Sequence, residues 1–267
     1  MLEIFKESTF LYPLISLALI AIPLALLGIF VIFKRISFFS DAISHSSIFA
    51  IALAYLLGIN INIVAILWVI LFSILLFVLK EKTKLDLGLL VMILSILGLS
   101  LGVIIFSYIP YIKGNINSFL FGNIFLVSLE DLIIILLAAI LVILFFIFKT
   151  KDLVMISLNE DLAYTENINV KKINFIFNLI LAIVIVLGIK FLGALLISAI
   201  LLIPTSIAKM IANSFKELIF YSLFYSETIS IFSFFISYFL NIPLGPCMVI
   251  LGSLIFLTIL TFQRKII

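Results

Sequence analysis

Two residues that could bind a metal ion lie one helical turn apart in a chain that is otherwise almost continuously apolar. Asp41 and His45 occur in the stretch RISFFSDAISHSSIF, residues 35–49, and His45 is the only histidine in the 267 residues. In a helix, residues i and i+4 project from the same face, so the carboxylate and the imidazole would lie side by side. This pair is the first candidate for chemistry in the sequence.

An oxygen and a nitrogen ligand together form a borderline-hard pair. Zn²⁺, Mn²⁺ and Fe²⁺ accept such ligands, whereas Cu(I) prefers sulfur and Mg²⁺ and Ca²⁺ prefer oxygen alone. A divalent ion would also stabilise both the carboxylate and the neutral imidazole. The alternative is that Asp41 and His45 bond each other or a neighbouring helix and serve only packing.

The composition indicates a polytopic membrane protein. Hydrophobic residues make up 66% of the chain, charged residues only 11%, and the mean hydropathy is +1.49. Soluble domains average about half apolar and a quarter charged residues, because they need a polar exterior. A lone cysteine, Cys247, excludes an intrachain disulfide framework and a thiolate metal cluster.

Nine segments have the length and hydropathy of membrane-spanning helices. These candidate spans are 10–33, 37–58, 61–79, 87–107, 131–148, 173–190, 193–212, 218–240 and 246–263. The segment 108–130 is apolar but is interrupted by proline and glycine, so it predicts a partly re-entrant or interfacial connection. We therefore expect a single all-α transmembrane domain over residues 1–267, with eight or nine spanning helices.

The distribution of lysine and arginine predicts the orientation. With the 149–172 loop in the cytoplasm and alternation outward from it, only Lys6, Lys113 and Lys190 face outside. The basic residues placed inside are Lys34, Arg35, Lys80, Lys82, Lys84, Lys149, Lys151, Lys171, Lys172, Lys209, Lys216, Arg264 and Lys265. Because cytoplasmic loops are enriched in Lys and Arg, we expect an external N-terminus and a cytoplasmic C-terminus.

The position of Asp41 and His45 in the second span makes them functional candidates. If this span begins near Ile36, Asp41 lies about 8 Å and His45 about 14 Å deep, against a half-thickness of about 15 Å. An ionisable side chain at such depth costs on the order of 3 kcal/mol and is functional by default. Four serines lie on or beside the same face: Ser37, Ser40, Ser44 and Ser47. Ser37 and Ser44 are therefore candidates for lining a polar pathway.

Several segments in order resemble one family. KRISFFSDAISHSSIFAIALAYLLG resembles the early segment of permease subunits of the bacterial zinc/manganese/iron ABC importers, in which a basic pair precedes an Asp and a His four residues apart. Further similar segments are SFLFGNIFLVSLEDL (118–132), LNEDLAYTENINVKKIN (158–174), FLGALLISAILLIPTSIAKMIA (191–212) and ISYFLNIPLGPCMVIL (236–251). The chain departs from the pattern at Phe239 and Asn241, where members often carry His and Asp, and at Asn167, where glycine is common.

The resemblance implies an architecture and a set of partners. Two permease copies form the path, cytoplasmic ATPase subunits drive it, and an extracytoplasmic protein delivers a zinc, manganese or iron ion. The chain has no G-x-x-x-x-G-K-[ST] phosphate loop, so it needs a separate ATPase. The resemblance implies metal contact by Asp41 and His45, and two copies would supply two of each ligand.

The segment at about 150–172 is the expected contact with the ATPase. Ser157 and Asn159 are possible helix caps, and Glu160 and Asp161 follow early, which predicts a short cytoplasmic helix. The resemblance implies that Asn159, Glu160, Asp161 and Ala163 couple to the ATPase. The alternative is an ordinary solvated loop.

Two other residues are pathway candidates. Pro204 lies inside the seventh span, where a proline kinks the helix and frees a carbonyl group. Glu227 lies near the middle of its span, where it either lines the path or pairs with a serine or tyrosine. Two other function classes stay open: an intramembrane metal-dependent enzyme and a structural subunit of a membrane complex. A single histidine makes a three-ligand catalytic zinc site hard to build.

Overall fold

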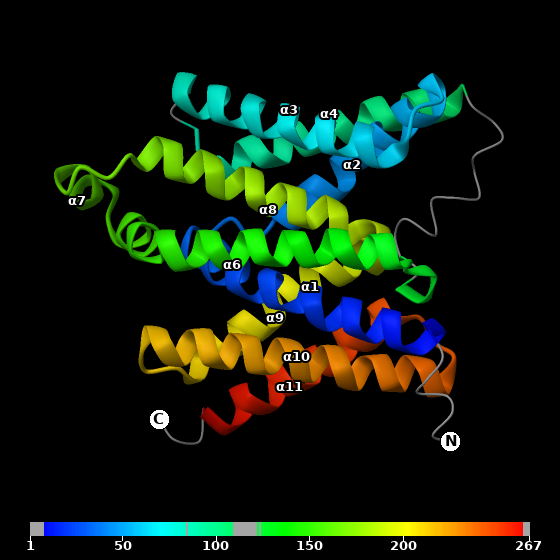
Figure 1. Cartoon of the computed structure of the whole chain (residues 1–267). Helices are drawn as coiled ribbons and strands as arrows, with labels where there is room; N and C mark the ends of the chain where they lie inside the picture. The colour runs from blue at the N-terminus through cyan, green and yellow to red at the C-terminus, as the bar shows by residue number, and fades with distance from the viewer. Residues whose placement is uncertain (1–7, 84, 109–121, 123, 264–267) are drawn as a thin grey trace.

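The computed structural model describes residues 8–83, 85–108, 122 and 124–263, and these residues form helices and short connections without a strand (Figure 1). The helices are α1 (Ser8–Phe33), α2 (Phe39–Leu57), α3 (Ile61–Lys82), α4 (Leu87–Ser107), η3 (Ile124–Leu126), α6 (Leu129–Leu158), α7 (Glu160–Thr165), α8 (Val170–Leu192), α9 (Ala194–Ile211), α10 (Phe215–Leu240) and α11 (Leu244–Gln263). The all-α prediction is confirmed for this part of the chain.

Eight of the described helices are long and apolar enough to cross a membrane. They are α1, α2, α3, α4, α6, α8, α10 and α11, and each matches one expected span. The remaining expected span, 193–212, corresponds to α9, whose apolar part is shorter. Most of the segment 108–130 lies outside the described residues, and so does its predicted re-entrant conformation.

The long helices lie side by side along a common direction, with α1 near the centre (Figure 1). α1 packs against α6, α9 and α10, while α2 packs most extensively against α4. α3 and α4 form one edge of the bundle, and α10 and α11 form the opposite edge. A single apolar core runs through the bundle and includes Phe30, Phe177 and Phe234.

Polar side chains cap several helices. At the start of α6, the hydroxyl of Ser128 accepts a hydrogen bond from Asp131 N–H at 3.2 Å, and Asp131 Oδ2 accepts one from Ser128 N–H at 3.2 Å. Asn60, Asn169 and Ser214 accept backbone N–H groups at the starts of α3, α8 and α10 in the same way. These bonds satisfy N–H groups that have no partner within the helix.

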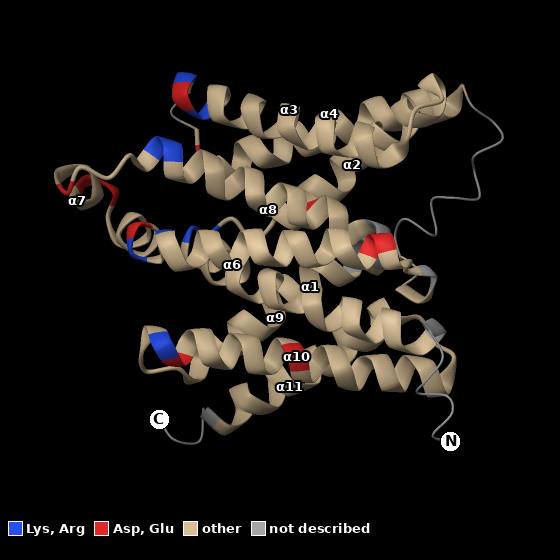
Figure 2. Cartoon of the chain, in the orientation of Figure 1, with Lys and Arg blue, Asp and Glu red and all other residues tan. Residues whose placement is uncertain are grey.

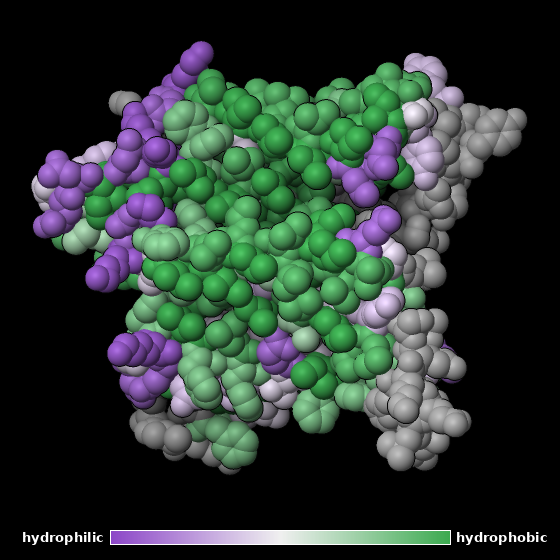
Figure 3. Space-filling view, in the orientation of Figure 1, coloured by the Kyte–Doolittle hydropathy of each residue, from purple (hydrophilic) through white to green (hydrophobic). Residues whose placement is uncertain are grey.

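The charges gather at the ends of the bundle. The lysines and arginines coloured blue in Figure 2 lie at the end of the bundle that carries α7. Figure 3 shows a largely apolar surface over the middle of the same face, interrupted by a hydrophilic group over α10, and hydrophilic side chains toward its ends. A belt of this kind is what lipid can solvate directly, because acyl chains offer no hydrogen bonds to polar groups.

Candidate metal site and coupling segment

α2 begins at Phe39, three residues after the expected start at Ile36. Asp41 therefore lies in the first turn, and His45 lies about 9 Å along the helix rather than about 14 Å. The helix starts late because residues 34–38 form a tight turn, in which Arg35 has a φ of 57°. The amino end of a helix carries partial positive charge, so it is a favourable place for a carboxylate.

Asp41 is held by a chain of hydroxyl groups that reaches it from another helix. The hydroxyl of Ser198, in α9, donates a hydrogen bond to Asp41 Oδ1. Ser40 Oγ and Ser198 Oγ lie 2.9 Å apart. Because Ser198 has one hydroxyl proton and gives it to Asp41, Ser40 must be the donor to Ser198. This chain fixes the direction of the carboxylate.

His45 lies on the outward side of the protomer. Its side chain is exposed, Asp41 is half-buried, and the opposite face of α2 is buried in the core through Ala42, Ile43 and Ala50. Acyl chains offer no hydrogen bonds to an exposed imidazole in an apolar helix. Such a side chain is therefore expected to face a polar surface or a water-filled cavity. Among the residues that the structure describes, no group of three or more His, Cys, Asp and Glu side chains is placed to hold a metal ion.

The serines beside this pair differ in their surroundings. Ser44 and Ser47 are buried and donate to backbone carbonyls of their own helix, Ser40 O at 2.8 Å and Ile43 O at 2.7 Å. Ser37 is half-buried in the turn before α2. Ser44 thus points into the protomer, away from the exposed face that bears His45.

Two glycines of α4 set the position of α2. A Cβ atom on Gly98 would lie 2.7 Å from Ser46 Cβ, and one on Gly102 would lie 2.7 Å from the backbone nitrogen of Phe49. Real Cβ contacts are not this short, so only glycine permits the two helices to approach this closely. The sequence Gly-x-x-x-Gly in α4 is therefore part of what positions α2, the helix that carries Asp41 and His45.

The other two pathway candidates, Pro204 and Glu227, lie on helices other than α2. Pro204 is buried in α9, six residues beyond Ser198. Glu227 lies in α10, and its Oε1 is buried without a hydrogen-bond partner. The residue that the structure places against Asp41 is Ser198, not Pro204 or Glu227. Ser198 was not identified as a candidate from the sequence. Nothing in the local sequence of α9 distinguishes Ser198 from its other polar residues Thr205 and Ser206, so the sequence offered no signal for this contact.

The coupling segment is a separate short helix at the end of the bundle. Asn159 caps α7 through its side-chain oxygen, which accepts Asp161 N–H at 2.8 Å and Leu162 N–H at 3.3 Å, as predicted. The expectation that Ser157 is a cap was wrong, because α6 continues to Leu158 and Ser157 donates to Leu153 O within it. The polar stretch is thus partly a continuation of the spanning helix.

A left-handed residue follows the end of α7, at the position where the resemblance gives glycine as common. Asn167 has a φ of 58°, a conformation that asparagine tolerates better than most residues. The backbone N–H of Ile168 then donates a hydrogen bond to Ala163 O at 3.0 Å, and Ala163, within α7, is fully buried. Glu160 and Asp161 are exposed.

Sequence reasoning also missed an apolar patch on this segment. Leu158 is 81% exposed, Leu162 56% and Tyr164 48%, although they lie beyond the apolar part of α6. Large apolar side chains exposed beyond the spanning part of α6 are candidates for contact with a protein partner. The leucines four residues apart were the signal in the sequence.

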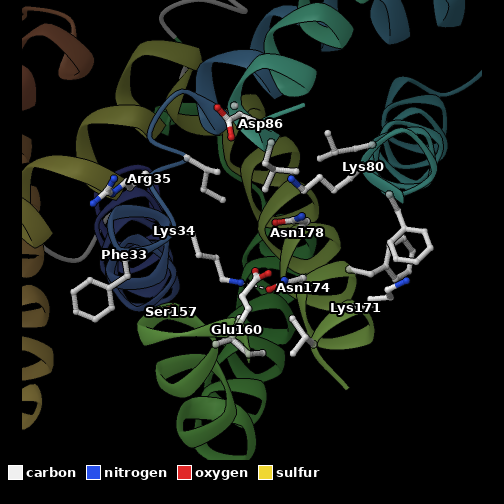
Figure 4. Close-up of a pocket in the computed structure, with 18 of the residues that line it drawn as sticks. Phe33, Lys34, Arg35, Lys80, Asp86, Ser157, Glu160, Lys171, Asn174 and Asn178 are labelled. Atoms are coloured by element: carbon white, nitrogen blue, oxygen red, sulfur yellow. Dashed lines mark hydrogen bonds between the residues drawn. The ribbon is translucent and has the colours of Figure 1, made fainter. Parts of the chain in front are cut away.

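A cavity of about 910 Å³ opens beside α7 (Figure 4). Lys34, Asn174 and Glu160 meet in it, and Lys34 Nζ donates a hydrogen bond to Asn174 Oδ1. Burial lowers the pKa of Lys34 to about 8, and the negative charge of Glu160 opposes this shift. Ser73 and Asn178 reach the cavity from α3 and α8.

Comparison with known proteins gives consistent matches over nearly the whole chain. Residues 8–263 match the model of the ABC 3 transport family. The chain is 30% identical over 251 residues to the high-affinity zinc uptake system membrane protein ZnuB of Haemophilus influenzae, covering 94% of this chain and 95% of ZnuB. It is 32% identical over 246 residues to the manganese import system permease protein ScaB of Streptococcus parasanguinis, covering 91% and 87% of the two chains.

A solved structure is similar as well. A chain in the structure of PsaBC from Streptococcus pneumoniae in complex with Fab superposes with a TM-score of 0.83 and 28% sequence identity. The match covers 97% of this chain and 95% of that chain. The likeness therefore extends over the whole helical arrangement, including α2 and α7.

Proposed function

Because the chain belongs to the ABC 3 transport family and is a permease subunit of an ABC importer, we propose that Asp41 and His45 bind its transported metal ion between two identical subunits. The protein is a multi-pass membrane protein and not an enzyme, and a separate partner chain hydrolyses ATP. The substrate we propose is a divalent transition metal. Zinc and manganese come first, since the named relatives carry these ions, and ferrous iron suits the same ligands.

The observation that carries the proposal is the exposed Asp41–His45 face of α2. Ser198 directs the carboxylate of Asp41, and His45 projects from the same face without a cover inside the protomer. One Asp and one His leave a metal that prefers four to six ligands under-coordinated. A second copy across a two-fold axis supplies the same pair again. Coordination by side chains at an open interface is weak enough for the ion to leave toward the cytoplasm.

The partners follow from the two ends of the bundle. α7, with Asn159, Glu160, Asp161 and Ala163, contacts the ATPase subunit, and the exposed Leu162 adds apolar area to that contact. The basic end faces the cytoplasm, in keeping with the enrichment of Lys and Arg in cytoplasmic loops. An extracytoplasmic metal-binding protein delivers the ion at the opposite end. Ser37, in the turn before α2, is the remaining candidate for lining the route. Ser44, Pro204 and Glu227 lie away from the Asp41–His45 face and support the helices beside the route.

Metal-stimulated ATP hydrolysis tests the proposal. The permease is reconstituted in proteoliposomes with its ATPase and binding protein, and hydrolysis and uptake are measured with Zn²⁺, Mn²⁺ and Fe²⁺ in turn. His45→Ala should abolish stimulation by the active ion, while Leu56→Ala, an exposed change on the same helix, should preserve it. Full metal uptake by His45→Ala would refute the assignment of the site.

A further inference from the structure

Lys34 is a charged residue that the metal route does not use, although it lies between α7 and the metal-site helix. It belongs to residues 34–38, which connect α1 to α2. Its Nζ donates to Asn174 of α8 and lies 5.1 Å from the centre of the Phe177 ring. Glu160 of α7 faces the same ammonium group across the cavity (Figure 4).

The turn that carries Lys34 is held by hydrogen bonds on both sides. Lys34 N–H bonds Phe30 O at 2.8 Å, and Phe39 N–H bonds Ile36 O at 2.9 Å. Between them Arg35 occupies the left-handed region, which few non-glycine residues adopt. A bonded turn of this length moves as a unit, so displacement of Lys34 displaces the start of α2.

The surroundings of Lys34 make it sensitive to a nearby charge. The ammonium is partly desolvated, and a charge acts more strongly in such surroundings than in water. By contrast, the ion pair of Lys171 and Glu81, 2.5 Å long, lies exposed at the rim of the cavity, where water and salt screen it. Movement of Glu160 with α7 thus changes the energy of Lys34 more than that of the rim pair.

We propose that Lys34 is a positioning residue that transmits movement of α7 to the start of α2, and through it to Asp41. This rests on the proposed function, in which α7 contacts the ATPase and Asp41 binds the metal. The open cavity beside Lys34 gives α7 room to move relative to α8, which a close-packed interface would not allow. Asn174 and Phe177 define the position of the Lys34 ammonium on the α8 side, and movement of Glu160 displaces it from that position.

Transport stoichiometry tests this role. In the reconstituted complex with its binding protein, Lys34→Met should lower the number of metal ions moved per ATP hydrolysed by about tenfold. Equilibrium metal binding should stay within about twofold, because Lys34 is not a ligand and lies away from Asp41 along the chain. The matched control is Lys80→Met: Lys80 lines the same cavity but bonds Leu85 O, 3.1 Å away beside its own helix. It should keep the wild-type ratio.

A pH series separates a charge role from a merely structural one. Since the pKa of Lys34 is about 8, its charge is lost as pH rises through 8, and the stoichiometry of the wild type should fall between pH 7 and 9. Lys34→Arg stays charged and should hold its ratio over that range. The other charged or titratable groups around the cavity are Arg35, Lys80, Glu81, Asp86, Glu160, Tyr164 and Lys171. They are common to both proteins, so the difference between the two profiles reports Lys34.

The outcomes divide clearly. A wild-type ratio in Lys34→Met, or identical pH profiles for wild type and Lys34→Arg, would overturn the proposal. If Lys34→Met is not produced, Asn174→Leu removes the hydrogen bond from the other side and should also lower the ratio. If the wild-type complex moves no metal, or His45→Ala moves it fully, the proposed function fails instead, so the two failures are distinguishable.

Discussion

α2 and α10, the two least hydrophobic of the eight described spans, differ in where their ionisable and hydroxyl side chains lie. α10 turns its serines inward, and the buried ones are Ser222, Ser226, Ser230, Ser233 and Ser237. Ser226, for example, donates to Ala21 O of α1 at 3.1 Å. α2 buries serines too, but it turns His45 outward and leaves Asp41 half-exposed.

The difference teaches which polar residues serve packing and which serve transport. A buried serine is small, so two helices can approach closely, and its hydroxyl can bond a carbonyl. An exposed imidazole gains nothing from lipid and needs another polar surface. The carboxylates of the two helices also differ. Asp41 accepts a hydrogen bond from Ser198, whereas Glu227 Oε1 is buried without a hydrogen-bond partner.

Replacement of each carboxylate in turn by an amide should give the largest difference in metal uptake between variants of α2 and α10. Asp41→Asn keeps the shape of the side chain but removes the charge of the proposed metal ligand, and we expect metal uptake to fall by at least about a hundredfold. Glu227→Gln is the matched control and should change uptake by less than about threefold, because this side chain lies apart from the Asp41–His45 face. Uptake is measured in proteoliposomes at equal protein amounts. Equal losses in both variants would place Glu227 in the pathway and contradict the distinction.

A second change tests whether α4 positions α2. Gly102→Ala puts a Cβ atom 2.7 Å from the backbone nitrogen of Phe49, which cannot move without moving α2. We expect a loss of about 1–3 kcal/mol in the free energy of unfolding, together with weaker metal binding. Gly88→Ala, at the start of α4, meets nothing within 4 Å and should leave stability equal or slightly higher. Thermal melting and metal titration of both variants in detergent would show this, and equal melting temperatures would argue against the close contact.

The sequence predicted the helical elements better than the contacts between them. The spans follow from hydropathy, and the Asn159 cap and the left-handed Asn167 follow from local chemistry, so all were predictable. The bond from Ser198 to Asp41 joins residues 157 positions apart and has no local signal. The same holds for the outward direction of His45, because a helical pattern assigns a common face without saying which neighbours cover it.

Removal of the Ser198 hydroxyl should have a smaller, more specific effect. Ser198→Ala leaves Asp41 in place but no longer directed, and we expect metal affinity to fall by about tenfold. Ser47→Ala is the control, since its hydroxyl serves only Ile43 O of its own helix. Metal titration of the purified complex measures both. Unchanged metal affinity in Ser198→Ala would mean that the hydrogen bond from Ser198 is not needed to orient the Asp41 carboxylate.

The smallest expected effect concerns α7. Asn159→Ala removes the cap and should destabilise this short helix by about 1 kcal/mol, which corresponds to about a fivefold weaker association with the ATPase. Asn60→Ala removes a similar cap at the start of α3, away from α7, and should leave this association unchanged. Co-purification at graded ATPase concentration measures the effect. Equal weakening by both changes would indicate a general loss of stability.

The length of α6 has a consequence for the assembly as a whole. Thirty residues make a continuous rod of about 45 Å, while the hydrocarbon layer is about 30 Å thick. Roughly ten residues must therefore stand beyond the acyl chains as a stiff extension, with Lys149 and Asp152 paired 2.9 Å apart along it. This extension places α7 beyond the acyl chains, where the ATPase subunit of the proposed function would contact it outside the lipid.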